Sequence, residues 1–211
     1  MEQEKKLGIL FYVLIAITIA MIIFAVISFK KPILNDKYVY TSPSGEQFQF
    51  FKSKLENFTQ HIATIYAVDK KGNKHQVDIP FINDPYSLED IEIFGNVKDK
   101  ILKKQGIFVT LDPYGSSKSV LAAIEITRVI GTNDYGVFKI PTQSATFKPT
   151  NTTFPYINCA NATKDIGVIY LFLGNNTRVA SLGECVVVEG KNYDDLIKAA
   201  DKLTLHLLGV M

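Results

Sequence analysis

The stretch IFVTLDPYGSSKSVLAAIEITRVIG, residues 107–131, decides the fold class of this chain. Its first five residues, 107–111, are apolar and β-branched types that favour a buried strand. The apolar residues of 119–130 recur at helical spacing, and Gly131 follows them as a helix-ending residue. A strand followed at once by a helix is a βα unit. We therefore predict an α+β or α/β layered domain.

The loop between this strand and this helix is the best candidate for a small-ligand site. In α/β sheets, ligands and anions bind at the carboxyl ends of strands, where the free N–H groups of a helix N-terminus point outward. The candidate binding residues are Gly115, Ser116, Ser117, Lys118 and Ser119. The loop lacks the spacing of a P-loop, and an ordinary helix cap would account for the same residues. A ligand site here predicts a concave pocket beside the end of the strand.

The C-terminal segment carries the clearest alternation of strands and turns. Three strands and a helix are expected, over residues 168–173, 177–181, 184–189 and 193–208. Asn192 is the expected N-cap of the helix, and Gly209 follows its last turn. We predict a three-stranded meander packed against this helix.

Two segments upstream complete the predicted domain. Residues 37–81 read as short strands separated by turn residues, which predicts an antiparallel sheet. Residues 96–105 are a short Lys-rich helix candidate closed by Gly106. Residues 141–155 are rich in Thr and Pro and have little periodicity, so we expect an exposed connection there.

An uncharged apolar run covers residues 7–29. At about 1.5 Å per residue, a helix of this length spans roughly 34 Å, and the hydrocarbon core of a bilayer is ~30 Å thick. The run is longer than the apolar region of a cleaved signal peptide, and no small-x-small site ends it cleanly. We therefore expect one uncleaved transmembrane helix in contact with membrane lipid. A cleaved signal peptide is the competing interpretation.

These patterns divide the chain into six segments. In order, they are a short cytoplasmic tail (1–6), the transmembrane helix (7–29), a β-rich segment near the membrane (30–95), a βα segment (96–140), a Thr/Pro-rich connection (141–157) and a C-terminal unit (158–211). The residues after the helix, about 180, suffice for one domain or for two small lobes that share a core.

Two features favour an extracytoplasmic domain with the N-terminus in the cytoplasm. Four N-x-[ST] sequons begin at Asn57, Asn151, Asn161 and Asn175. The two cysteines, Cys159 and Cys185, have neither metal-site nor C-x-x-C spacing, so a structural disulfide is their simplest account and two unpaired thiols are the alternative. The positive charges beside the apolar run slightly favour the opposite orientation. We give the sequons and the cysteines more weight, because the difference is one charge.

Composition and motifs argue against several functional classes. A net charge of +2 and the scarcity of arginine give no reason to invoke nucleic acid. The acidic residues within 84–92 lack the spacing of an EF-hand, the three histidines are isolated from one another, and no G-x-S-x-G motif occurs. We therefore expect no metal, no cofactor and no catalytic site.

Three functional hypotheses follow. The leading one is a non-enzymatic, membrane-anchored accessory or scaffolding protein of the cell envelope, which acts through protein–protein contacts. The first alternative is an extracytoplasmic module that binds a small ligand or anion at residues 115–119. The second is a tethered envelope hydrolase or transferase, whose catalytic residues would come from distant positions in the sequence.

Overall fold

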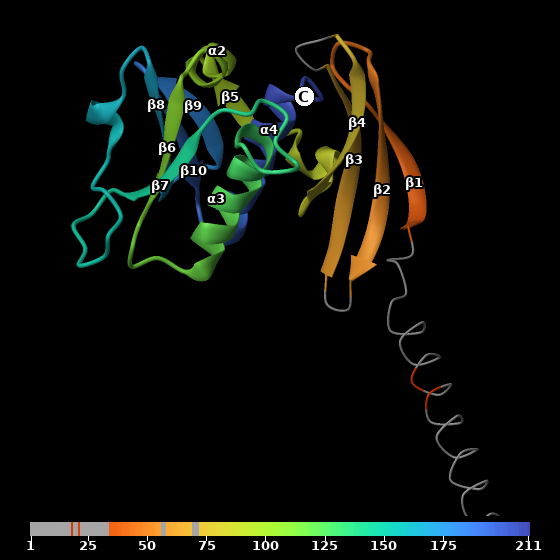
Figure 1. Ribbon diagram of the computed structural model, residues 1–211, viewed down its shortest axis with the longest axis horizontal. Helices are drawn as coiled ribbons and strands as arrows, with labels where there is room; N and C mark the ends of the chain where they lie inside the picture. Colours follow the sequence, from red (N-terminus) through yellow and green to blue (C-terminus); the bar gives the residue numbers. More distant parts are fainter. Residues whose placement is uncertain (1–17, 19–20, 22–33, 56–57, 69–71) are drawn as a thin grey trace, which may run out of the picture. The chain divides into compact units, whose positions relative to one another are not determined.

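The computed structural model of the protein describes residues 18, 21, 34–55, 58–68 and 72–211 (Figure 1). Residues 35–211 belong to one compact unit. The described residues form two β-sheets and three α-helices, which confirms the predicted α+β class. The predicted tail 1–6 lies outside the described residues. So does the predicted transmembrane helix 7–29, apart from positions 18 and 21. Among the described helices, none has the length and apolarity needed to cross a bilayer.

The larger sheet has six strands in the order β5-β9-β10-β8-β6-β7. Their bounds are Glu92–Phe94 (β5), Gly106–Leu111 (β6), Thr142–Thr146 (β7), Ile166–Leu173 (β8), Arg178–Leu182 (β9) and Cys185–Gly190 (β10). The helices are α2 (Val97–Leu102), α3 (Ser117–Ile130) and α4 (Tyr193–Leu207). The strand and helices predicted from the sequence in this part of the chain are confirmed to within a few residues.

At one place in this sheet, the connections that leave two neighbouring strands lead to opposite sides of the sheet. Strands β6, β7, β8 and β10 are parallel, and β5 and β9 run in the opposite direction. From β6 the chain passes through α3 to β7 at one edge, whereas β8 leads to β10 on the other side. The boundary between β6 and β8 is therefore a topological switch point, the place where open α/β sheets bind their ligands.

The predicted C-terminal meander is wrong. Strand β10 lies between β8 and β9, parallel to the first and antiparallel to the second, so that β8 and β9 do not pair. Five of the six residues of β10 are buried, but only one of the five residues of β9 is. The more apolar strand takes the inner position, where its main-chain groups pair on both sides, and the more polar strand lies further out in the sheet.

The predicted exposed connection 141–157 is only partly correct, because it begins with strand β7. This strand pairs in parallel with β6, from Ile107 opposite Thr142 to Leu111 opposite Thr146. Strand β7 lies at the edge of the sheet, where a strand can be polar, so its sequence shows no apolar period. The rest of the connection lies on the face of the sheet away from α3 and α4 (Figure 1). There the Thr110 hydroxyl donates to the Ile157 carbonyl at 2.8 Å.

The smaller sheet has four strands in chain order. They are β1 (Leu34–Thr41), β2 (Gln47–Leu55), β3 (Phe58–Val68) and β4 (Lys74–Phe81). Strands β2, β3 and β4 are antiparallel neighbours, as predicted for residues 37–81. On one face the cross-strand neighbours Phe50, Ala63 and Ile79 are fully buried. This face forms the second part of the core.

Helices α3 and α4 lie between the two sheets (Figure 1). Ile126 of α3 and Leu203 of α4 pack in the core of the six-stranded sheet. Val129 of α3 and Leu205 of α4 belong to the core of the four-stranded sheet. Each helix therefore buries two sides, because two sheets cover it.

A buried cluster of charged groups lies where the two helices meet. Arg128 donates to the Glu125 carboxylate at 2.7 Å and to the Pro80 carbonyl at 2.5 Å. Asn83 donates to one Asp201 oxygen through its backbone N–H and its side-chain amide, both at 2.9 Å. Burial, followed by the negative charge of Glu125, raises the pKa of Asp201 well above its ordinary value. The two carboxyl groups interact directly, and a shared proton would satisfy their remaining oxygens.

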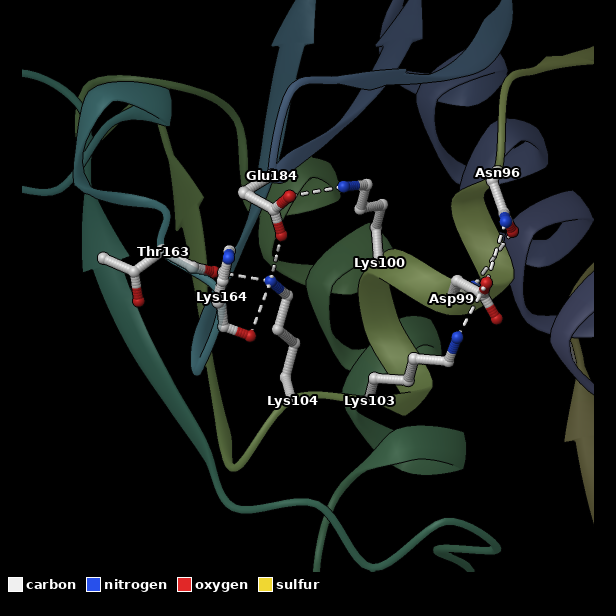
Figure 2. A network of polar contacts seen from close by, with 8 residues as sticks. All are labelled: Asn96, Asp99, Lys100, Lys103, Lys104, Thr163, Lys164 and Glu184. Atoms are coloured by element: carbon white, nitrogen blue, oxygen red, sulfur yellow. Dashed lines mark hydrogen bonds and ion pairs between the residues drawn. The ribbon is translucent and has the colours of Figure 1, made fainter.

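A second polar cluster joins α2 and the residue Lys104 after it to the turn between β9 and β10 and to the residues before β8 (Figure 2). The side chain of Lys104 is only 2% exposed, and its ammonium donates to Glu184 at 2.6 Å and to the carbonyls of Thr163 and Lys164. Lys100 also pairs with Glu184. Hydrogen bonds from these two lysines lower the pKa of Glu184 to about 2. The turn between β9 and β10 is thus tied to the helix that follows β5.

The substitution Glu184→Gln is expected to lower the denaturation midpoint at pH 6 and to have little effect near pH 2. A carboxylate with a lowered pKa stabilises the folded state above its ordinary pKa, and this contribution is lost as the pH falls towards about 2. Urea unfolding at several pH values tests this. Glu46→Gln, at an exposed position, is the control. An equal effect of Glu184→Gln at both pH values would contradict the assignment.

Candidate functional site

The loop between β6 and α3 serves first as a helix cap. The Ser116 side chain accepts a hydrogen bond from the backbone N–H of Lys118, and the Ser119 hydroxyl donates to the Ser116 carbonyl. The Lys118 ammonium pairs with Asp194, in the first turn of α4, at 2.6 Å. The cap interpretation therefore explains part of the predicted motif. The ion pair joins the N-termini of two helices.

A pocket of about 230 Å³ lies at the carboxyl ends of β6 and β8, directly above the switch point. We call it the switch-point pocket. Its lining residues are Asp112, Ser119, Phe147, Lys148, Tyr170, Leu171, Phe172, Leu173, Tyr193 and Leu196. The concave pocket that a ligand site at this loop predicts is therefore present.

Of the five predicted binding residues, only Ser119 lines this pocket. Gly115 lies beside it, because a Cβ atom there would be 3.1 Å from the Ser119 hydroxyl and 3.5 Å from the Tyr193 hydroxyl. Ser116, Ser117 and Lys118 do not line the pocket. The pocket thus lies beside the predicted loop, and nine of its ten lining residues are not among the five predicted ones.

The charged groups of the pocket form one ion pair. Lys148 donates to the Asp112 carboxylate at 2.5 Å, and the backbone N–H of Tyr114 donates to the same carboxylate at 3.0 Å. Partial burial would raise the pKa of Asp112, but the hydrogen bonds from Lys148 and Tyr114 outweigh burial and lower it. Asp112 is therefore an ionised hydrogen-bond acceptor with a neutralising partner. The Ser119 hydroxyl donates to the Ser116 carbonyl at 2.6 Å, so its proton is already engaged.

Aromatic side chains form one wall of the pocket. The rings of Phe147 and Tyr170 stack with centroids 4.5 Å apart, and Phe172 follows at 5.6 Å from Tyr170. Burial raises the pKa of Tyr170, so its hydroxyl keeps its proton. The wall thus combines flat apolar faces with a hydroxyl group.

The sequence offered little signal for the residues on this wall. Phe147 and Lys148 come from the connection after β7, Tyr170 from β8, and Tyr193 from the start of α4. Only the strand order brings these segments together. Of these residues only Tyr193 lies at a predicted boundary, the start of the helix over 193–208.

The second candidate surface is the part of the six-stranded sheet that neither the helices nor the connection covers. It contains a groove of about 420 Å³, which we call the apolar groove. The groove is lined by Phe94, Cys159, Tyr170, Phe172, Arg178, Ala180, Ser181, Leu182 and Val187. Phe94 is 44% exposed and Leu182 is 66% exposed, which is high for such large apolar side chains.

A hollow with charges of both signs adjoins the apolar groove. Its volume is about 400 Å³, and it shares Phe94 and Arg178 with the groove. Its charged lining residues are Asp90, Glu92, Arg178, Lys191, Asp195 and Lys198. An apolar centre beside a charged rim is the usual anatomy of a protein–protein interface.

The predicted disulfide is confirmed. Cys159 and Cys185 are bonded, with Cα atoms 5.2 Å apart. Cys159 lies in the connection across the sheet and Cys185 at the start of β10, so the bond fixes the connection to the sheet.

The sequons that the structure describes are accessible. Asn151, Asn161 and Asn175 are all exposed, and Asn57 lies outside the described residues. The side-chain oxygen of Asn161 accepts a hydrogen bond from the backbone N–H of Asn158. Glycan attachment at these positions stays a prediction. Among the described residues, no group of three or more acidic, histidine or cysteine side chains is arranged to hold a metal ion.

Comparisons with family models, with curated protein sequences and with solved structures find no significant match for this chain.

Proposed function

We propose that the protein is a membrane-anchored accessory or scaffolding protein of the cell envelope, and that it docks a partner protein through the apolar groove. The observation that carries the proposal is the uncovered part of the six-stranded sheet, where Phe94, Phe172 and Leu182 face a continuous hollow. Contiguous exposed apolar surface with a polar rim is typical of interaction sites.

The two halves of this sheet face differ in a way that supports docking. On the β6 side, the connection after β7 covers the sheet and the disulfide holds it in place. On the β9 side, Leu182 and Phe94 have no such cover. A partner that covers these apolar side chains stabilises the complex by roughly 25 cal/mol per Å² of apolar surface removed from water.

The expected partner is a protein that inserts an apolar side chain into the groove and presents charged groups around it. The adjoining hollow is lined by three acidic and three basic residues, so a partner with mixed charge fits better than a strongly cationic or anionic one. The extracytoplasmic placement rests on the disulfide and the exposed sequons. The anchor is the apolar run over residues 7–29.

Co-purification with groove variants tests this proposal. The full chain is extracted in detergent as wild type, as Leu182→Asp and as the matched control Ile124→Asp, whose side chain is 45% exposed on α3. We expect a partner to co-purify with wild type and control, and to be reduced at least tenfold with Leu182→Asp. Equal recovery with both variants, or recovery of the protein alone, would contradict docking at the groove.

A specific observation favours a second candidate function, the binding of a small ligand. The switch-point pocket lies where this function predicts it, and its polar groups converge from four segments of the chain. The two functions are compatible, since a docking protein can also bind a ligand.

A further inference from the structure

We infer that the switch-point pocket binds an uncharged, polyhydroxylated ring, that is, a single sugar residue of a glycan or a free monosaccharide. This inference goes beyond the docking function, because the pocket extends to the carboxyl ends of β6 and β8 and includes side chains that the apolar groove lacks. The residues that line the pocket and not the groove include Asp112, Ser119, Phe147, Lys148 and Tyr193.

The size of the pocket limits the ligand. Its volume is about 230 Å³. Pockets for drug-sized ligands measure roughly 300–1,000 Å³, so this pocket takes a smaller molecule, of about one ring.

The charges of the pocket argue against an anion. The charged side chains that line the pocket are Lys148 and Asp112, and they neutralise each other at 2.5 Å. A phosphate or carboxylate would have to displace the Asp112 carboxylate or lie beside it, and like charges repel. A cation would meet Lys148. A neutral ligand avoids both costs.

The remaining groups of the pocket match a ring with several hydroxyls. Phe147 and Tyr170 stack on each other, and the ring faces and edges that this stack leaves uncovered give the C–H side of a sugar an apolar surface to lie on. Asp112 accepts hydrogen bonds, the Lys148 ammonium has further donors beyond its bond to Asp112, and the Tyr170 hydroxyl donates and accepts. A hydrocarbon ring would leave these polar groups unsatisfied, and each such group costs free energy.

The rim of the pocket is held in place by contacts between its segments. The Tyr114 hydroxyl donates to the Pro149 carbonyl at 3.1 Å, which joins the loop after β6 to the connection after β7. The Lys118–Asp194 pair joins α3 to α4. A pocket fixed in this way spends less free energy on ordering its side chains when a ligand enters.

Saturation-transfer NMR on the full chain tests the inference. The protein is kept in a polyoxyethylene detergent, because the sugar headgroup of a maltoside would compete. The probes are methyl glycosides of glucose, galactose, mannose and N-acetylglucosamine, with phosphate (as methyl phosphate, whose methyl protons are observable), acetate and benzene as the anionic and apolar comparisons. We expect transfer to at least one glycoside, with affinity in the millimolar range that a single ring supports.

Two variants with matched controls locate the binding. Phe147→Ala removes an aromatic face, and Asp112→Asn removes a charged acceptor while keeping the shape of the side chain. Each is expected to weaken glycoside binding about tenfold. Phe154→Ala, an exposed aromatic of the same connection, and Asp134→Asn, an exposed acidic position, are expected to leave it unchanged.

Every outcome decides the inference. Glycoside binding that only Phe147→Ala and Asp112→Asn weaken supports it. Binding of phosphate, acetate or benzene in preference to the glycosides overturns the ligand class. No binding of any glycoside, or binding that all four variants leave unchanged, overturns it as well. The circular dichroism and melting temperature of each variant show whether it is folded. If Phe147→Ala does not fold, Asp112→Asn and its control Asp134→Asn still test the inference.

Discussion

Replacing Arg128 with methionine is expected to lower the free energy of unfolding by about 3–5 kcal/mol at pH 7. Arg128 is the partner of the Glu125 carboxylate, whose side chain is 1% exposed, and Glu125 lies against the fully buried Asp201. Without the guanidinium, the buried Glu125 must either keep an unpaired negative charge or take up a proton. Equilibrium unfolding in urea measures the loss.

Two further measurements separate the charge effect from lost packing. The double variant Glu125→Gln/Arg128→Met removes both charges, so it should recover most of the loss. The loss in the single variant should shrink as the pH falls towards 4, because Glu125 then binds a proton and burial already raises its pKa. A loss below about 1 kcal/mol at pH 7, or a loss that does not change with pH, would show that the Arg128–Glu125 pair does not stabilise the core as we describe.

Removing the disulfide is expected to cost about 3.5 kcal/mol of unfolding free energy. The two cysteines are 26 residues apart, and the chain-entropy model gives this value for a loop of that size. The bond also holds the connection after β7 against the sheet, so Cys159→Ala/Cys185→Ala should increase hydrogen exchange at residues 147–161 more than in α3 or α4.

Reduction of the wild-type protein is the control for this prediction. Dithiothreitol should lower the melting temperature of wild type to near that of the double variant and should leave the variant unchanged. An equal stability of oxidised and reduced wild type would contradict a structural role for the bond.

The fold class could be predicted from the sequence, but the order of the strands could not. The strand at 107–111 and the helices at 119–130 and 193–208 carry strong local patterns, which the structure confirms. The insertion of β10 between β8 and β9 depends on which strand is more buried, a property of the whole sheet. Strand β7 was missed because an edge strand can be polar.

The candidate site shows the same limit. Residues 115–119 lie at the end of the sheet where the switch-point pocket is found, and they could be identified because a helix N-terminus after a buried strand is a local feature. Lys148 and Tyr170 were not identified, because parallel pairing of β6 with β7 and β8 brings them beside Asp112. The apolar groove was not predicted either. Whether an apolar strand face is covered depends on the course of the connection over residues 147–161.

Site-specific photo-crosslinking tests docking at the apolar groove most directly. A photoreactive amino acid replaces Leu182 in the groove or, as control, Ile124 on α3, and the full chain is irradiated in its own membrane. We expect a crosslink from position 182 to one defined envelope protein, and none to that protein from position 124. A product of twice the mass of this chain would identify a second copy as the occupant. Crosslinks to lipid alone, or the same products from both positions, would contradict the docking role of the groove.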